Sequence, residues 1–380
     1  MTGKKVRVLV VDDTVLYRKV VSDVLAMIPE VEVVGTANNG KIALAKLEQL
    51  KPDLMTLDFE MPEMDGLATL LELQKIKSDV AVVMVSAHTS EGAAVTMKAL
   101  ERGAFDFIAK PDGSSLEKNR QALLSQLKPV VQSVTTRRLL RPALAGPPRP
   151  GVQGPAAAPV RSTPVVPPRP HPATSQPAMT AAPVRPLQPA GRVAVVAIGI
   201  STGGPNALAE VIPRLPKNLR VPVVVVQHMP PVFTKALADS LDQKSLVKVV
   251  EAQGEERLEA GHVYIAPGGR QMKVVKKAAG EFLQLTDDPP ENHCKPAADY
   301  LFRSVSAVYG NRALGVIMTG MGADGVKGLR LMKQQGAQVI AQDEESCVVF
   351  GMPMEAIKAG VTDVVMPLQQ ISAEIVNRVK

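Results

Sequence analysis

Short apolar runs alternate with longer amphipathic segments over residues 6–109. Five runs rich in valine and isoleucine have the length of buried strands, namely Val6–Val11, Val31–Thr36, Leu54–Asp58, Val80–Ser86 and Phe105–Ala109. Between them, apolar residues recur at helical spacing in Leu16–Ile28, Lys41–Gln49, Gly66–Lys75 and Gly92–Arg102. This alternation predicts an α/β domain built on a doubly wound, parallel (βα)5 sheet, which binds ligands at the carboxyl ends of its strands.

A second alternation of this kind begins after residue 192. The strand-like run Val193–Gly199 is followed by a glycine turn, a helical segment and another buried strand, Val221–Gln227. Residues 245–290 have hairpin features around Pro267, Gly268 and Gly269. We therefore expect a second α/β domain with a mainly parallel sheet.

The segment 141–192 separates the two alternations and contains 15 of the 32 prolines and no acidic residue. It has no periodic apolar positions, so it cannot bury enough surface to offset the entropy of the chain, and we expect an extended, disordered linker. The predicted organisation is a first domain over residues 1–128, a Pro/Arg-rich linker over 141–192 and a second domain over 193–380.

The net charge of +7 is concentrated in this linker, which has six arginines. Outside it, 38 basic residues face 37 acidic residues, and only 3% of the chain is aromatic. Basic surface and aromatic stacking platforms for nucleic acid are therefore both scarce. We expect no nucleic acid among the partners.

The sequence carries no signal for membrane insertion or export. No apolar run reaches about 18 residues. In the first residues, MTGKKVRVLVVDD, acids directly follow a short apolar run and no small-residue cleavage site is present. Two cysteines, Cys294 and Cys347, are too few for a disulfide framework and do not form a zinc motif. We expect a cytoplasmic protein that is not inserted in a membrane.

Polar residues end four of the five strands of the first domain. Asp12 and Asp13 follow the first strand, Asp58 ends the third, Ser86 ends the fourth and Lys110 follows the fifth. Parallel strands bring these ends to one edge of the sheet, where converging carboxylates favour a hard cation such as Mg²⁺. A metal, a hydroxyl and an ammonium group around one carboxylate suit phosphoryl transfer to Asp58.

Each of these residues has a structural alternative when taken singly. An acidic pair after a strand is often a helix N-cap, and Lys110 before proline is also typical of a solvated loop. The functional interpretation is favoured because independent strand ends all carry the required chemistry.

Residues 1 to about 125 resemble a response-regulator receiver domain, most closely in the run LDFEMPEMDGL around Asp58. The resemblance implies that a histidine kinase phosphorylates Asp58. It implies Mg²⁺ binding by Asp13, Asp58 and the backbone carbonyl of Glu60, assisted by Asp12. It also implies phosphoryl contacts from Ser86 and Lys110, with Phe107 as the switch aromatic.

The second domain opens with a candidate nucleophile. Gly199, Ile200, Ser201, Thr202 and Gly203 fit the GxSxG pattern, in which glycines allow a sharp turn that lifts the serine above a sheet. A glycine-rich phosphate loop and a simple N-cap serine are the alternatives. The motif alone does not decide between them.

A serine nucleophile needs a base and a carboxylate that orients the base. His228 directly follows the apolar strand VPVVVVQ, on the edge where Ser201 emerges, whereas His262 and His293 have weaker positions. Asp324 lies in another strand–turn–helix segment, GVIMTGMGADGVKGL, although it could instead cap the following helix. We favour a Ser–His–Asp triad.

Two features limit this interpretation. The order Ser…His…Asp differs from the Ser…Asp…His of α/β-hydrolases, so that fold is not implied. Cys294 beside His293 is a candidate Cys/His nucleophile pair, but adjacent residues of an extended segment point apart.

The runs GISTGG, VVVVQHM and IMTGMGADG resemble the catalytic domain of chemotaxis protein-glutamate methylesterases, the CheB family, and the resemblance covers nearly the whole chain. It implies Ser201 as nucleophile, His228 as base and Asp324 as orienting carboxylate. It also implies that the backbone N–H of Met321 contributes to the oxyanion site. NHCKPAADYLF matches a family segment, with Cys294 at a position usually occupied otherwise.

The resemblance further implies hydrolysis of glutamate methyl esters on the cytoplasmic domains of chemoreceptors, and deamidation of receptor glutamines. A chemotaxis histidine kinase would be the phosphodonor, and the catalytic domain would need no cofactor. We expect a monomer whose unphosphorylated receiver inhibits the esterase by packing over its active-site edge. The alternatives are a response regulator that hydrolyses a small ester and one whose output is binding.

Overall fold

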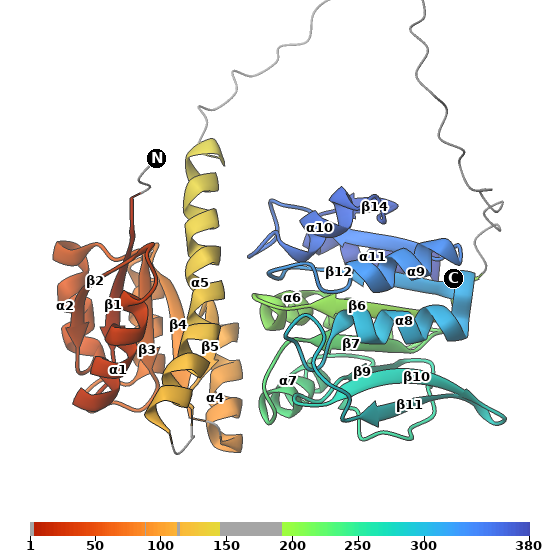
Figure 1. The fold of residues 1–380 in the computed structure, drawn as a ribbon, viewed down its shortest axis with the longest axis horizontal. Helices are drawn as coiled ribbons and strands as arrows, with labels where there is room; N and C mark the ends of the chain where they lie inside the picture. Colours follow the sequence, from red (N-terminus) through yellow and green to blue (C-terminus); the bar gives the residue numbers. More distant parts are fainter. Residues whose placement is uncertain (1–3, 88, 112–114, 145–191) are drawn as a thin grey trace, which may run out of the picture.

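The computed structural model describes residues 4–87, 89–111, 115–144 and 192–380 of the chain. These residues form two α/β domains that lie side by side (Figure 1). Most of the segment expected to be a linker, residues 145–191, lies outside the described residues.

The N-terminal domain alternates strands and helices as the sequence predicts. Its elements are β1 (Val6–Val11), α1 (Val15–Ala26), β2 (Val31–Ala37), α2 (Gly40–Leu50), β3 (Leu54–Asp58), α3 (Gly66–Lys75), β4 (Ala81–Ser86), α4 (Ser90–Glu101), β5 (Asp106–Ala109) and α5 (Leu116–Leu144).

All strands of this domain are parallel and follow the order β2-β1-β3-β4-β5. The order reverses between β1 and β3, so the carboxyl ends of these two strands flank the switch point, where doubly wound sheets bind ligands. The predicted (βα)5 fold is therefore confirmed.

Helix α5 continues well past residue 128, where the sequence analysis ends the first domain. Val130, Val131 and Val134 are buried in the same core as β1 and β4, and this burial favours continuing the helix. The helix ends at Leu144 and thus includes the first four residues of the segment expected to be a linker.

The C-terminal domain is larger and also α/β. Its elements are β6 (Val195–Ile200), α6 (Gly204–Val211), the 3₁₀ turn η1 (Ile212–Arg214), β7 (Val223–Gln227), α7 (Phe233–Asp242), β8 (Lys248–Glu251), β9 (His262–Ile265), β10 (Gln271–Lys277), β11 (Gly280–Thr286), α8 (Ala298–Tyr309), η2 (Gly310–Arg312), β12 (Ala313–Ile317), α9 (Val326–Gln334), β13 (Gln338–Gln342), α10 (Met352–Lys358), β14 (Val364–Met366) and α11 (Leu368–Arg378).

Seven of these strands form one parallel sheet in the order β14-β13-β12-β6-β7-β9-β8, and β10 and β11 form an antiparallel hairpin. The mainly parallel sheet is thus confirmed. The order reverses between β6 and β12, so this sheet also has a switch point, with β7 on the other side of β6.

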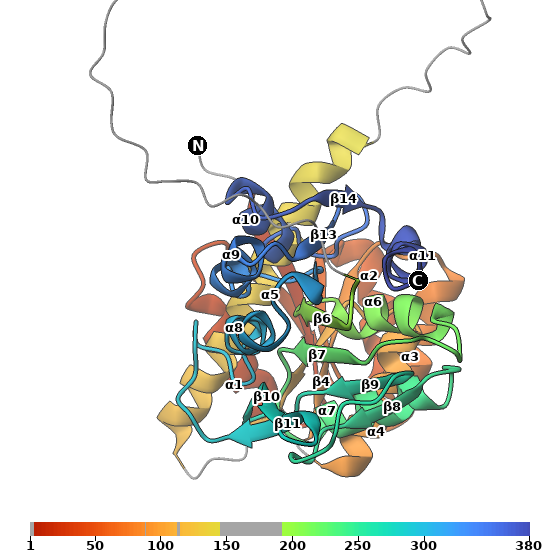
Figure 2. The same cartoon turned by 90° about the vertical axis from the view of Figure 1, so that its right-hand side faces the viewer.

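Alternate residues of the central strands point to opposite faces of this sheet. Val195 and Ala197 pack with α8, α9 and α10, whereas Val196 and Ile198 pack with α6, α7 and α11. In Figure 2, α8 and α9 lie to the left of β6 and β7, and α6 and α11 lie to the right.

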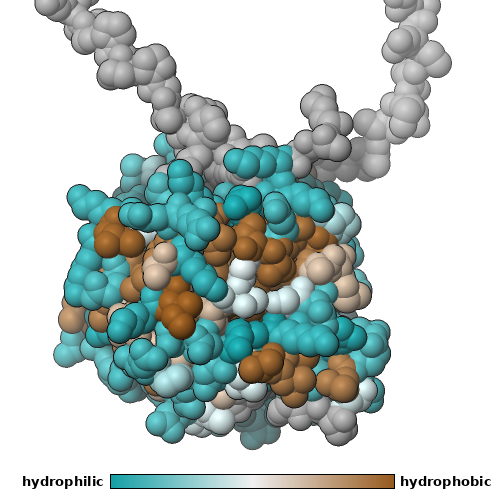
Figure 3. Space-filling model, turned by 90° about the vertical axis from the view of Figure 1, so that its left-hand side faces the viewer, coloured by the Kyte–Doolittle hydropathy of each residue, from teal (hydrophilic) through white to brown (hydrophobic). Residues whose placement is uncertain are grey.

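The second of these cores does not stop at the domain boundary. One cluster of buried apolar residues contains Met97 and Leu100 of α4 together with Leu237 and Leu241 of α7. The two domains are therefore joined by apolar packing between α4 and the helices α6 and α7. The outer face of the N-terminal domain carries both hydrophilic and hydrophobic residues (Figure 3).

Candidate active sites

The N-terminal domain brings its strand-end carboxylates together at the switch point. Asp12 and Asp13 follow β1 and Asp58 ends β3, and one oxygen of each lies within 4.8 Å of the others. Lys110 places Nζ 3.0 Å from Asp12 Oδ2 and 2.8 Å from Asp58 Oδ2. Three carboxyl groups thus cluster here and two of them contact one ammonium group, and this arrangement suits a hard divalent cation.

Burial controls the electrostatics of Asp58. Desolvation, with repulsion from Asp12, raises the pKa of Asp58 to about 6, although the hydrogen bond from Lys110 opposes the shift. Desolvation also acts to lower the pKa of Lys110, but its contacts with Asp58 and Asp12 outweigh it and raise that pKa. A cation here would offset the excess negative charge, so the residues present fit Mg²⁺.

Ser86 and Glu60 line the same hollow as Asp58 and Lys110. Ser86 donates its hydroxyl hydrogen to the carbonyl of Gly92 at 3.1 Å, and this bond ties the end of β4 to the first turns of α4. Most of the predicted phosphorylation residues, although neither Asp12 nor Phe107, therefore line one cavity.

The candidate nucleophile Ser201 lies at the switch point of the C-terminal sheet. It directly follows β6, and its backbone N–H donates to the carbonyl of Thr319 at 2.9 Å, beyond the end of β12. A Cβ built on Gly320 would lie 2.7 Å from the Cβ of Ser201, so the turn after β12 runs directly against the serine.

Glycines are required in the turn that carries Ser201. Gly203 has a φ of 75°, and a Cβ there would also lie 2.5 Å from the Cβ of Val348. A Cβ on Gly204 would overlap the side chain of Gln227, whose Nε2 donates to the carbonyl of Ser201 at 2.9 Å. The GxSxG pattern thus corresponds to a tight strand–turn–helix connection.

His228 and Asp324 meet at the same edge. His228 follows β7, and its Nε2 lies 2.7 Å from Asp324 Oδ2 in the turn after β12. The backbone N–H of His228 donates to the carbonyl of Ile200 at 3.1 Å, so the histidine is adjacent to the serine turn. The sequence argument placed these three residues on one edge, and the structure brings them to neighbouring strand ends.

Asp324 also caps a helix, but not the one that follows it in the chain. Its carboxylate accepts hydrogen bonds from the backbone N–H groups of Ala298 at 2.6 Å and Asp299 at 3.1 Å, in the first turn of α8. Asn292 Nδ2 donates to it at 2.7 Å. These bonds fix the carboxylate that holds His228.

The histidine and the aspartate shift each other's pKa values. Desolvation acts to lower the pKa of His228, but the hydrogen bond to Asp324 and the contact with Cys294 outweigh it and raise that pKa to about 9. Desolvation acts to raise the pKa of Asp324, but His228 and the α8 N–H groups outweigh it and lower that pKa. The imidazolium–carboxylate pair is therefore the favoured form at neutral pH.

The second ring nitrogen of His228 faces a cysteine. Nδ1 lies 3.5 Å from Cys294 Sγ, and among the hydrogen bonds of the described residues none joins His228 to the hydroxyl of Ser201. Cys294 is next to His293 in the sequence, but the structure pairs it with a histidine 66 positions away.

The remaining predicted residues have distinct places. Met321 lies in the turn between Gly320, which touches Ser201, and Asp324. His262 stacks on Tyr264 at a centroid distance of 5.9 Å. Among the contacts of the described residues, it forms no hydrogen bond with His228 or Asp324.

The N-terminal domain contacts the turn that carries Ser201. The Asp106 carboxylate accepts a hydrogen bond from the side chain of Thr202, and its burial raises the pKa of Asp106 to about 7 despite this bond. The predicted switch residue Phe107 stacks on Phe233 of α7 at a centroid distance of 4.5 Å.

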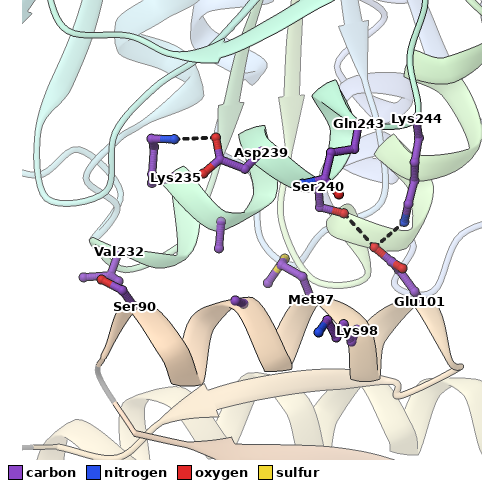
Figure 4. A pocket seen from close by; sticks show the side chains of 12 residues that line it. Ser90, Met97, Lys98, Glu101, Val232, Lys235, Asp239, Ser240, Gln243 and Lys244 are labelled. Atoms are coloured by element: carbon purple, nitrogen blue, oxygen red, sulfur yellow. Dashed lines mark hydrogen bonds and ion pairs between the residues drawn. The ribbon is translucent and has the colours of Figure 1, made fainter.

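A polar contact flanks this apolar one. Glu101 of α4 accepts a hydrogen bond from Ser240 at 2.6 Å and forms an ion pair with Lys244, and all three residues line the hollow between α4 and α7 (Figure 4). Asn206 Nδ2 donates to the carbonyl of Ala104 at 3.2 Å.

Comparison with known proteins finds matches to both domains. A family model described as a response regulator receiver domain matches residues 8–120, and one described as CheB methylesterase matches residues 196–375. A protein from Desulfotalea psychrophila (strain LSv54 / DSM 12343), named protein-glutamate methylesterase/protein-glutamine glutaminase, is 48% identical over 379 residues, which are 99% of each chain. This chain belongs to the protein-glutamate methylesterase/protein-glutamine glutaminase family.

A member of this methylesterase/glutaminase family with the same name, from Bacillus subtilis (strain 168), is 44% identical over 99% of each chain. The Thermotoga maritima CheB methylesterase catalytic domain, known from a crystal structure, is 43% identical and covers 49% of this chain and 98% of its own, with a TM-score of 0.48. The resemblance stated from the sequence is thus confirmed, and the chain is a response regulator and an enzyme of this family. The N-terminal domain is called the receiver domain below, and the C-terminal domain the catalytic domain.

Several contacts of this methylesterase-family site carried no signal in the sequence. Asn292 and Gln227 hold Asp324 and Ser201 through contacts between segments far apart in the chain, and Cys294 reaches His228 in the same way. Among the described residues, no helix combines the length and apolar character needed to cross a membrane.

Proposed function

We propose that this chain hydrolyses the methyl esters of glutamate side chains on the cytoplasmic domains of chemoreceptors, and deamidates receptor glutamines. Residues 193–380 would carry out this chemistry under the control of the receiver domain, residues 1–128, through a linker over 141–192. The support comes from the full-length likeness to relatives named for both reactions, and from Ser201, His228 and Asp324 at neighbouring strand ends.

Ser201 acts as the nucleophile in this mechanism. Its Oγ attacks the ester carbonyl while its proton passes to Nδ1 of His228, because Asp324 already holds Nε2. His228 then protonates the leaving methoxide, and methanol departs from an acyl-enzyme. Water activated by the same nitrogen opens the acyl-enzyme. For a glutamine side chain the leaving group is ammonia and the remaining steps are unchanged.

Asp324 and Met321 support the charges that develop. Asp324 stabilises the imidazolium of His228 and is itself held by the N-terminus of α8. The backbone N–H of Met321, in the turn that touches Ser201, is proposed to stabilise the oxyanion. These steps use side chains and backbone only.

The receiver domain would accept a phosphoryl group from a chemotaxis histidine kinase on Asp58. Asp12, Asp13, Asp58 and the backbone carbonyl of Glu60 would hold Mg²⁺, which neutralises charge on the transferring phosphoryl group. Lys110 and Ser86 would contact the phosphoryl oxygens. Proximity supports this assignment, since Lys110 already contacts both Asp12 and Asp58.

Phosphorylation would relieve inhibition. The receiver domain contacts Thr202, next to Ser201, and packs Phe107 on Phe233. These contacts support a closed form in which a large substrate is excluded from the serine. A change in the position of Phe107 on phosphorylation would weaken its stacking on Phe233 and allow a receptor helix to reach Ser201.

The observation that carries the proposal is the short His228–Asp324 contact beside the Ser201 turn. Its test is the release of radiolabelled methanol from methylated receptor membranes, compared with hydrolysis of a small soluble ester. Rapid release from receptors that depends on Ser201 supports the proposal. Hydrolysis of the soluble ester alone would point to a small-ester hydrolase, and no hydrolysis of either to a binding output.

A further inference from the structure

The two cysteines of the chain are both partly exposed and differ in their neighbours. Burial, with the nearby charge of Asp343, raises the pKa of the Cys347 thiol, which favours the unreactive protonated form. Cys294 is partly exposed, and its Sγ lies 3.5 Å from Nδ1 of His228. Cys294 thus joins His228 and Asp324 in a cluster whose ligating atoms lie within 4.8 Å of one another.

This geometry places the thiol beside a potential base. Asp324 holds Nε2 of His228, so Nδ1 is the nitrogen that can exchange a proton with the sulfur. A thiol within hydrogen-bond reach of an imidazole that is oriented by a carboxylate is the arrangement of cysteine nucleophiles. The thiolate formed by such a transfer is the species that reacts with electrophiles and peroxides.

We propose that Cys294 is a thiol modification site at which peroxides and alkylating electrophiles switch off the esterase. The inference rests on the proposed function, because it assigns Nδ1 of His228 to Ser201 as well as to Cys294. A group attached to Sγ would occupy the space beside Nδ1 of His228. It would thereby prevent the Ser201 hydroxyl from transferring its proton to this nitrogen.

The reaction with hydrogen peroxide balances within the site. The Cys294 thiolate attacks one peroxide oxygen, an S–O bond forms and the O–O bond breaks. The leaving hydroxide takes the proton that His228 had received from the thiol, which gives water. The sulfur is oxidised by two electrons to a sulfenic acid, and the peroxide is reduced by two electrons.

The first test measures reactivity without any substrate. The full-length protein is treated with iodoacetamide, and peptide mass spectrometry follows carbamidomethylation at both cysteines. Cys294 is expected to react at least about tenfold faster than Cys347. His228→Gln should move this ratio toward one, because the proton acceptor is gone. Equal rates at the two cysteines in the parent chain would overturn the proposal.

The second test connects modification to the serine. A fluorophosphonate probe labels activated serines, so labelling of Ser201 is measured by mass spectrometry beside methanol release, before and after hydrogen peroxide. Relative to its own untreated rate, the parent and the Cys347→Ser control should lose most of both signals, whereas Cys294→Ser should keep them. Dithiothreitol should restore the oxidised parent.

The outcomes separate this inference from the proposed function. Unchanged Ser201 labelling in a protein whose Cys294 is fully modified would overturn the inference and leave the triad intact. An untreated protein that is not labelled at Ser201 would instead contradict the proposed function. The ratio of alkylation rates would still decide whether Cys294 is the reactive thiol.

Discussion

His228 has a contact on each of its ring nitrogens, and the two contacts have different consequences. The bond from Nε2 to Asp324 fixes the ring, whereas Nδ1 faces the sulfur of Cys294. In the proposed mechanism, Ser201 and Cys294 would both exchange a proton with this one nitrogen.

Ser201→Ala should abolish methanol release from methylated receptors. The variant removes only an oxygen at a turn that is held by backbone hydrogen bonds, so the fold should be retained. Loss of a triad nucleophile lowers the rate by about four orders of magnitude or more. Steady-state rates together with circular dichroism check this expectation, and a folded variant with near-parental activity would refute the triad.

Methanol release should increase with pH through the titration of His228. The base must be neutral to accept a proton, and the pKa of His228 is raised to about 9. The value of kcat/KM should therefore rise from pH 7 to pH 9. Cys294→Ser removes one contact that raises this pKa, so the rising limb should move to lower pH. A limb at the same pH in both proteins would show that the sulfur does not influence the base.

The turn after β6 shows how an element constrains the site. Gly203 adopts a positive φ and lies against Val348, so both the backbone conformation and the space exclude a side chain. The position of Ser201 depends on this turn, because Gly204 donates its N–H to the Ser201 carbonyl at 2.7 Å.

Gly203→Ala should therefore reduce both stability and activity. The positive φ alone costs about 1–3 kcal/mol for a residue with a side chain, and the contact with Val348 adds to it. Gly360→Ala is a matched control, because Gly360 has a φ of 65° and no atom within 4 Å of the added Cβ. Chemical denaturation should show a larger loss of unfolding free energy for Gly203→Ala than for Gly360→Ala. Equal losses would show that the Val348 side chain moves away from the added methyl group at no cost in stability.

The sequence predicts the elements and strand-end residues of the site but not the contacts between loops. Asp12, Asp58, Ser201 and His228 could be placed because each follows an apolar strand, and parallel strands bring their carboxyl ends to one edge. No local pattern links Cys294 to His228, or Asp324 to the first turn of α8. Those contacts depend on how long connections fold back over the sheet edge.

Among the described residues, the two domains are held together by an apolar surface and a few polar contacts. α4 packs on α6 and α7, and the Glu101–Lys244 pair lies at the margin of this surface. Hydrogen bonds from Lys244 and Ser240 lower the pKa of Glu101 against the effect of its partial burial. Both side chains of the Glu101–Lys244 pair are partly exposed, so the pair contributes little to the stability of the contact between the domains.

Lys244→Glu should raise the basal activity of the unphosphorylated protein. Opposing Glu101 with a second carboxylate weakens the closed form by about 1 kcal/mol, equivalent to roughly a fivefold change in the population that is open. Methanol release measures this change. The double variant Glu101→Lys, Lys244→Glu restores opposite charges and should return activity to the parental level. Activity that stays high in the double variant would assign the effect to something other than charge.

Phosphorylation of Asp58 should activate the protein and require Mg²⁺. A small phosphodonor should increase methanol release only when Mg²⁺ is present, and Asp58→Asn should not respond.

The fragment 192–380 should match the phosphorylated chain. As a random coil, the 47 residues from 145 to 191 would span roughly 40 Å. Such a tether would favour closure only weakly, so the resting protein should keep appreciable activity. Equal rates of methanol release for the fragment, the unphosphorylated chain and the phosphorylated chain would show that the receiver domain does not inhibit the enzyme.

The apolar cluster shared by α4 and α7 gives activation a second effect. Separating the domains would bring Met97, Leu100, Leu237 and Leu241 into contact with solvent, so the active enzyme would display a surface that the resting enzyme conceals. Such a surface adheres to other apolar surfaces, including those of receptor helices and of further enzyme molecules. Turning the enzyme on would thereby also increase its tendency to associate, and the receiver domain would serve as a solubilising cover during the resting phase.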